Sequence, residues 1–474
     1  MKAKILFFSA VLFLISSQTA LAQMDCRSML GAHLTPFKKD LPILWAVEGT
    51  MAPGLMTSPF DSLNNTTLNG GMLLGALDFG FGNHKNHIYL EGGYKNWKNS
   101  EFVNNSTDEF SRHIGVRQAF YSYSGESIKI KVGLHETRMG DFFLVDERVL
   151  GVSVDKEIGA FTVNTILGTV NKSFARMGKF CANRHLYGLI NNGNYTENIG
   201  EKIGETNLAG IVINWNPHYK KAEVTTDNND EFSDSNTDEF SSDDEFSSSD
   251  EFETTDEFHE NHDFNEFGNS DEFSKEETNP KTKQKISVSN IALIFYDEFG
   301  TEEYIPENKF YTGALIDINL PFGFFIQTGG IYQNMLHQNT FVYIAKFGKS
   351  KMWNNASLTK ISGAYIGKTD IDKSSTFQPL FSNLFIGEIM RMDAAQFPLW
   401  QAMIKHRFPG KMKMHIAAKF VGQIEDAKTN EQDLEVGLMA FRNHLKVTLI
   451  GSHVQTEALP NDFMMLRLEM RLAF

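Results

Sequence analysis

The chain has 474 residues but only two cysteines and twelve prolines. So few cysteines exclude a disulfide-rich secreted scaffold. Gly-x-Ser-x-Gly, His-Glu-x-x-His and paired Cys-x-x-Cys motifs are also missing, and these are common local signatures of hydrolases, zinc peptidases and thiol sites. No catalytic residue, cofactor or metal site is implied, so we expect no enzyme. The acidic balance, −15 at pH 7, gives no reason to expect a nucleic-acid partner.

Long apolar runs are absent except near the N-terminus. The run Ile5 to Ile15 follows Lys2 and Lys4 and precedes Ala-Leu-Ala at 20–22. This pattern predicts a secretory signal, with the mature chain beginning at Gln23. The run is shorter than the roughly 20 residues that a spanning helix needs. A membrane protein without spanning helices must be a closed β-barrel, because no other backbone satisfies its polar groups in lipid.

Strict alternation of apolar and polar residues is the main positive signal. Leucine, methionine or phenylalanine occupies every even position from Met464 to the terminal Phe474, with Arg467, Glu469 and Arg471 between them. Alternate side chains of a strand point to opposite faces of its sheet. One face of this strand is therefore oily and the other charged, as a transmembrane barrel requires.

Similar alternation recurs about eighteen times along the chain, and sixteen strands fit nearly as well. The fold class that we predict is all-β: a transmembrane antiparallel β-barrel of about 16–18 strands in the bacterial outer membrane. Both chain ends and the short turns would be periplasmic, and longer links, including 137–148, would face outward. The competing interpretation is a soluble secreted β-sandwich with the oily face turned inward.

One segment accounts for the negative charge. Residues 222–274 contain 20 Asp and Glu but no Lys or Arg, and Asp-Glu-Phe begins at 230, 238, 244, 250, 256 and 271. Such dense like charge predicts a disordered insert. The predicted organisation begins with a signal peptide at 1–22 and an N-terminal segment at 23–40, which would plug the barrel if it enters the lumen. The two halves of the barrel follow at 41–221 and 286–474, with the acidic insert at 222–285 between them.

Inward-facing residues determine which solutes can cross a barrel. The predicted inward side chains are richer in positive than in negative charge, and this favours anionic solutes. We therefore expect an outer-membrane porin for passive diffusion of small solutes, with mild anion preference. Alternatively, these charges only pair with one another across strands. The predicted inward residues are Arg117, Lys129, Lys131, His135, Lys411, Lys413, Lys419, Arg467 and Arg471.

Two stretches carry resemblances to known families. The terminal strand resembles the closing strand of outer-membrane barrel proteins, which implies that the barrel assembly machinery reads Leu466, Leu468, Met470, Leu472 and Phe474 as an insertion signal. The stretch 128–155, IKIKVGLHETRMGDFFLVDERVLGVSVD, loosely resembles a hairpin of alginate-export and related porins. Both resemblances imply a porin-like barrel surrounded by outer-membrane lipid.

A second function remains open, in which the barrel is an anchor. The Asp-Glu-Phe repeats or the outer loops would then bind a partner protein, and the repeats would gain avidity by multivalency. The two cysteines, Cys26 and Cys181, could form a disulfide in an oxidising compartment. The predicted topology opposes this pairing, because Cys26 precedes the first strand and Cys181 falls in an outer loop. The cysteines meet only if the N-terminal segment threads the lumen.

Overall fold

The structure, a computed structural model, describes residues 28–38, 41–57, 65–82, 85–98, 112–140, 144–173, 175, 199–217, 286–335, 339–370, 377, 379–381, 398–410, 412–423, 429–457 and 461–474. The predicted signal peptide, Cys26, Cys181, Lys411 and the whole acidic insert lie outside these ranges. The described chain is almost entirely β-strand, with two short 3₁₀ turns, η1 (Leu30–His33) and η3 (Pro321–Gly323). No helix within these ranges is long and apolar enough to cross a membrane.

Alternation of burial along each strand identifies the two faces of the sheet. In β11 (Ser287–Gly300), Ala292, Ile294 and Tyr296 are buried, whereas Leu293 and Phe295 are exposed. A side chain on the outside of a ring of strands has no protein to cover it, so the buried face is the inner one. The other strands are β1 (Thr35–Pro36), β2 (Ile43–Met51), β3 (Gly54–Thr57), β4 (Asn65–Phe81), β5 (Asn86–Lys98), β6 (Arg112–Ser124), β7 (Ile128–Met139), β8 (Val145–Ile158), β9 (Phe161–Thr169), β10 (Thr206–Trp215), β12 (Lys309–Asn319), β13 (Phe324–Asn334), β14 (Thr340–Met352), β15 (Leu358–Asp370), β16 (Leu399–Arg407), β17 (His415–Gln423), β18 (Thr429–Ala440), β19 (Leu445–Thr456) and β20 (Phe463–Ala473).

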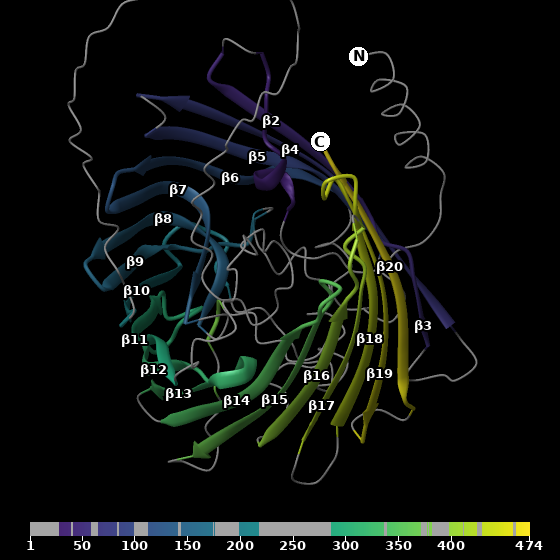
Figure 1. Ribbon diagram of the computed structural model, residues 1–474. Helices are drawn as coiled ribbons and strands as arrows, with labels where there is room; N and C mark the ends of the chain where they lie inside the picture. Colours follow the sequence, from purple (N-terminus) through teal and green to yellow (C-terminus); the bar gives the residue numbers. More distant parts are fainter. Residues whose placement is uncertain are drawn as a thin grey trace, which may run out of the picture.

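The sheet closes on itself (Figure 1). Each strand from β4 to β20 pairs antiparallel with its sequence neighbours, and β20 pairs with both β2 and β3. β2 and β3 are one wall strand interrupted at Ala52 and Pro53, because both also pair with β4. Proline has no N–H to donate to the ladder. The Pro53 carbonyl nevertheless accepts a hydrogen bond from the Leu468 N–H at 2.7 Å. With β2 and β3 counted as one, and without the two-residue β1, which pairs only with β2, the described wall has 18 strands, which confirms the predicted fold class.

The connections differ between the two ends of the barrel. Very short turns, such as 125–127, 159–160 and 441–444, lie at the end that also carries the C-terminus. Longer connections, such as 170–205 and 371–398, lie at the other end, as in outer-membrane barrels with periplasmic turns. Eight wall strands precede the connection 216–286 and ten follow it. The ends of the predicted acidic insert are therefore attached at the short-turn, periplasmic end.

Substitutions at Phe295 test whether the exposed face of the barrel contacts lipid. Its side chain is 45% exposed at the middle of β11, opposite Ile211 of β10. We expect Phe295→Arg to lower the free energy of unfolding by about 2–4 kcal/mol, because a cation near the bilayer midplane is costly. Urea unfolding in lipid vesicles, followed by tryptophan fluorescence, measures this. Phe295→Leu should cost little, and equal stability of the two variants would contradict a lipid-facing position.

Candidate functional site: the barrel interior

The hairpin of β7 and β8 leaves the wall and enters the barrel. β7 stays paired with β6 only as far as Leu134 opposite Ala119, but its pairing with β8 continues to Met139 opposite Val145. The separation begins next to Gly133, whose φ of 123° is rare for residues with a side chain. The prediction of a long outward link at 137–148 is therefore wrong, since the strands continue and only 140–144 connects them.

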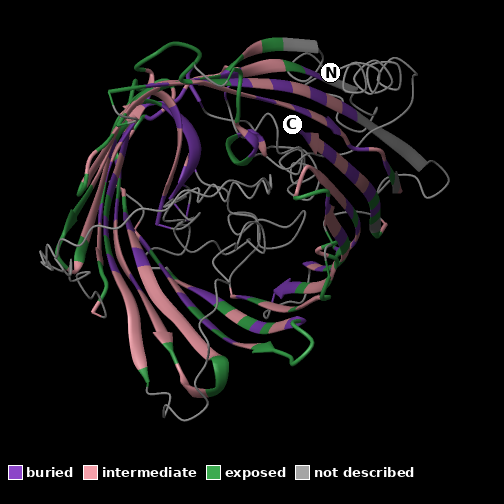
Figure 2. Ribbon diagram, turned by 45° about the horizontal axis from the view of Figure 1, so that its top comes forward, coloured by how far each residue is buried: buried purple, intermediate pink, exposed green. Residues whose placement is uncertain are grey.

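Burial on both faces shows that the end of this hairpin lies inside. Every residue from Leu144 to Val149 is buried, including Asp146, Glu147 and Arg148. A wall strand would expose every second side chain to lipid, so these residues are surrounded by protein. Figure 2 shows this buried end curving inward from the ring of strands. The hairpin therefore narrows the bore.

A second inserted segment comes from the connection between β15 and β16. The Asp146 N–H donates to the Phe381 carbonyl at 2.8 Å, and Val145 forms a parallel bridge with Phe381. The Leu380 N–H donates to Glu298 Oε1 at 2.8 Å. Glu298 is fully buried and also accepts from the Tyr296 hydroxyl at 3.1 Å. The carboxylate of β11 thus fixes this segment against the wall and the hairpin.

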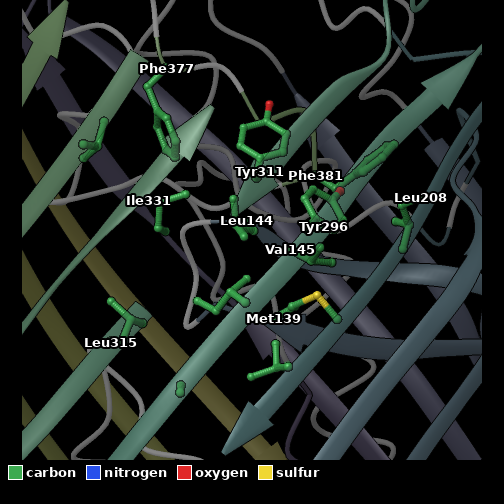
Figure 3. Close-up of a cluster of buried hydrophobic side chains, with 14 of the residues drawn as sticks. Met139, Leu144, Val145, Leu208, Tyr296, Tyr311, Leu315, Ile331, Phe377 and Phe381 are labelled. Carbon is green, nitrogen blue, oxygen red and sulfur yellow. The ribbon is translucent and has the colours of Figure 1, made fainter. Parts of the chain in front are cut away.

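Apolar side chains fill the space between these inserts and the wall (Figure 3). Leu144 and Val145 from the hairpin belong to the same buried cluster as Tyr296 and Tyr311 of the wall. Phe377 meets the Tyr311 ring edge-on, with 6.0 Å between centroids. This half of the inner face is therefore apolar and covered, which alternation alone did not predict. The cluster includes wall residues Leu208, Val212, Ile294, Leu315, Ile331, Val342, Ile344, Ile366, Leu399 and Val421.

The opposite side of the interior carries buried ion pairs. Arg117 of β6 is fully buried, and its Nε lies 3.2 Å from Glu91 Oε1 of β5. Glu91 Oε2 also accepts from the Tyr89 hydroxyl at 2.9 Å and from Gln118 Nε2 at 3.1 Å. A bulge between β5 and β6 brings Arg117 and Gln118 to the same carboxylate. Arg117 is thus held in a specific site.

The closing strand contributes a second group of pairs. Arg471 is 1% exposed, and its Nε donates to Glu469 Oε1 at 2.7 Å while its Nη1 lies 3.5 Å from Glu48 Oε1. Arg467 Nη2 lies 3.7 Å from Glu469 Oε2. The contact between Arg471 and Glu48 joins β20 to β2 across the closure. The alternative that inner charges pair across strands therefore describes Arg117 and Arg471, whereas the pair of Arg467 with Glu469 lies within β20.

The N-terminal segment lies against these pairs. Ser28 Oγ donates to Glu91 Oε2 at 3.2 Å, and the Met29 N–H donates to Glu48 Oε2 at 2.6 Å. Leu30 is fully buried in a cluster with Ala46, Ala52, Met72, Leu74, Ala76 and Tyr89. At the end of η1, the His33 and His444 rings lie 4.6 Å apart. Residues 28–34 therefore occupy the interior beside β2, β4 and β5.

Lysines dominate the inner face of β14 to β19 near the short turns. Lys360 of β15 lies directly opposite Lys405 of β16, and both amines are largely covered. Lys405 Nζ lies 3.8 Å from Glu435 Oε1, which His415 Nε2 approaches at 2.5 Å. Lys405 also lies within electrostatic range of Lys360, Lys419 and Lys446. Of this group only Lys419 was named from the sequence; Lys346, Lys360, Lys405 and Lys446 follow the same alternation.

The remaining predicted inner residues lie at separate places. Lys129 pairs in register with Asp155, and Lys131 Nζ lies 5.5 Å from the centroid of the Phe120 ring. His135 is fully buried, with Nδ1 3.0 Å from the Gly133 carbonyl. Lys413 precedes β17 and its N–H bonds to the Met439 carbonyl. The structure therefore groups Arg467 with Arg471 and places Lys419 among the lysines of β15 to β19.

The Arg117–Glu91 pair gives a direct test of the buried network. Arg117→Met leaves the Glu91 carboxylate buried beside an apolar side chain, and we expect it to destabilise the barrel by about 3 kcal/mol. Thermal unfolding in detergent measures the change. Adding Glu91→Gln to Arg117→Met should recover most of the loss, because no uncompensated charge then remains. A double variant as unstable as the single one would contradict the coupling.

Comparison with known proteins gives matches only among solved structures. No family model matches the chain, and no curated protein matches it significantly. A BenF-like porin from Pseudomonas fluorescens Pf-5 matches with a TM-score of 0.52 and 8% identity over 93% of this chain and all of that one. OccK9 (OpdG) of Pseudomonas aeruginosa matches with a TM-score of 0.53, 8% identity and the same coverage. The alginate-export resemblance of 128–155 stays a prediction.

These similarities are similarities of fold. They span nearly the full length of both chains, but the sequence identity is very low. They agree with the closed ring of 18 strands, the apolar outer face and the distribution of short turns. The chain is an outer-membrane β-barrel with the fold of a porin.

Proposed function

We propose that this barrel is a porin through which small solutes diffuse passively, with a mild preference for anions. The observation that supports it is the lysine group Lys346, Lys360, Lys405, Lys419 and Lys446, defined here as the lysine wall. Three carboxylates, Glu431, Asp433 and Glu435, lie on the inner face of β18 beside these five lysines, so fixed positive charge is in excess on this part of the inner face. Fixed positive charge raises the local concentration of anions.

In the described part of the chain, the inserted segments pack against other parts of the inner face than the lysine wall. The hairpin and residues 377–381 cover the apolar half of the inner face, and residues 28–34 cover the ion pairs beside β2 and β5. Arg117, Arg467 and Arg471 are paired with carboxylates, so they add little net charge to a solute path. Selectivity would therefore depend mainly on lysines that the sequence interpretation had not named.

Single-channel recording tests the proposal. Lys360→Gln combined with Lys405→Gln should lower the anion-to-cation permeability ratio about threefold, equivalent to about one kT of local potential. Reversal potentials in a salt gradient across a planar bilayer measure this ratio. Lys156→Gln is a matched control, because Lys156 lies on the outer face of β8, in step with exposed Leu150 and Val152. Clear cation selectivity of the unaltered protein would contradict the proposal.

The N-terminal segment would act as a plug that partly blocks this channel. Burial and the neighbouring His444 lower the pKa of His33, and the Asn443 backbone opposes this only in part. The docked N-terminal segment therefore favours the neutral His33 ring. Its docking should begin to weaken as pH falls below about 6.5, and the loss should continue until pH has passed the lowered pKa of His33.

We expect conductance to rise on acidification below about pH 6 and this rise to disappear in His33→Gln. Conductance of the purified barrel across pH 5 to 8 checks this. His453→Gln, which removes a histidine paired with Asp462, should keep the response. A pH response that is identical in His33→Gln and the unaltered protein would rule out this plug.

The second candidate function is an anchor whose acidic Asp-Glu-Phe repeats or outer loops bind a partner protein. The strand order favours a periplasmic partner for the repeats, because the ends of the 216–286 connection lie at the short-turn end. The same recordings separate the two functions, since a stable open channel supports the porin and a closed barrel supports the anchor.

Insertion by the barrel assembly machinery through Leu466, Leu468, Met470, Leu472 and Phe474 also remains a proposal. It is supported by the position of β20 as the closing strand and by the two backbone hydrogen bonds, 2.8 and 2.9 Å long, between Phe474 and Val47.

A further inference from the structure

β14, β15 and β16 are neighbours in the wall (Figure 1), and a polar row crosses their outer face near the periplasmic end. Lys351 of β14 lies opposite Thr359 of β15, and Thr359 lies opposite His406 of β16. Further from this end, the same face carries exposed Ile361 and Ile404. The row therefore marks the level at which the apolar band of the barrel gives way to lipid headgroups.

Hydrogen bonds fix the orientation of this row. Trp353 Nε1 donates to Thr359 Oγ1 at 2.8 Å, and Thr359 Oγ1 lies 2.8 Å from His406 Nδ1. Since the indole can only donate, the Thr359 hydroxyl hydrogen can donate in turn to Nδ1, which leaves the ring hydrogen of His406 on Nε2. The His406 ring packs edge-on against Phe408, with 4.7 Å between centroids. His406 is thus held as an oriented donor.

Two lysine ammonium groups lie over aromatic rings beside the row. Lys351 Nζ lies 3.7 Å from the centroid of the Trp353 ring, and Lys349 Nζ lies 4.3 Å from that of Phe324. A ring holds an ammonium in place without neutralising its charge. The outward positions of β13 to β16 and the turns 353–357 and 408–410 contain no Asp or Glu. This patch is therefore positively charged.

A hollow of about 680 Å³ lies between the two turns, lined in part by Lys351, Trp353, His406 and Phe408. We propose that it binds the headgroup of an anionic phospholipid in the periplasm-facing leaflet. Lys351 and His406 would contact the phosphate, and Lys349, the next outward residue of β14, would add positive charge beside the hollow. Ile361 and Ile404 would contact the acyl chains, which a free phosphate would not need. Basic pockets at the membrane surface hold anionic headgroups in this way.

Native mass spectrometry of the full-length barrel in non-ionic detergent, titrated with dioleoylphosphatidylglycerol, tests this assignment. Lys349→Gln combined with Lys351→Gln should raise the dissociation constant of the first bound lipid about 30-fold. Phosphatidylcholine, which has a phosphate but no net charge, should bind the unaltered protein more weakly. Unchanged channel conductance of the double variant shows that it has folded, because both lysines lie outside the lumen.

Lys156→Gln is again the matched control, since it removes an outward lysine near the same end of β8. It should leave lipid affinity unchanged. Equal losses in Lys156→Gln and in the double variant would overturn the proposal, because they would indicate a general charge effect. An unchanged affinity of the double variant, equal binding of the two lipids, or displacement of the lipid by inorganic phosphate would also overturn it.

Discussion

Closure of the sheet is the constraint on which the rest of this structure depends. In a bilayer every backbone N–H and C=O must find a partner, so an open edge at β20 or at the first strand would be costly. The contact between β20 and β2 and β3 removes that edge, and the pairs of Arg471 with Glu48 and Glu469 lie directly inside it. Backbone pairing and buried charge therefore join the same two ends of the chain.

The outer face needs only to be apolar, but the apolar part of the inner face must also be kept away from water in the bore. Its apolar half, with Ile294, Ile344 and Ile366, would meet water in an empty bore. The β7–β8 hairpin and Phe377 and Phe381 bury that surface, and burial of apolar area is worth roughly 25 cal/mol per Å². The inserts are therefore part of the folded core as well as obstacles in the channel. Removing them would expose the apolar wall to water.

Much of this architecture follows from alternation, because one residue in two along each wall strand meets lipid. That rule predicts about eighteen wall strands, including the first one, although sixteen strands fit the pattern nearly as well. It cannot predict that β7 and β8 leave the wall after Gly133, because both faces of the hairpin are then set by contacts with distant residues such as Phe381. It also cannot predict which carboxylate an inner arginine or lysine meets, since cross-strand register decides this.

Register also explains why the inner charges fall into two kinds. Arg117 meets Glu91 through a bulge, and Arg471 meets Glu48 through the closure, so each guanidinium has a buried carboxylate fixed by backbone pairing. On β15 and β16, by contrast, register places Lys360 opposite Lys405, and such like charges repel unless water or a counter-ion screens them. Glu435 lies 3.8 Å from Lys405 and offsets part of this repulsion. In the proposed porin, the lysines that remain in excess over carboxylates would give the lysine wall the net positive charge that favours an anionic solute.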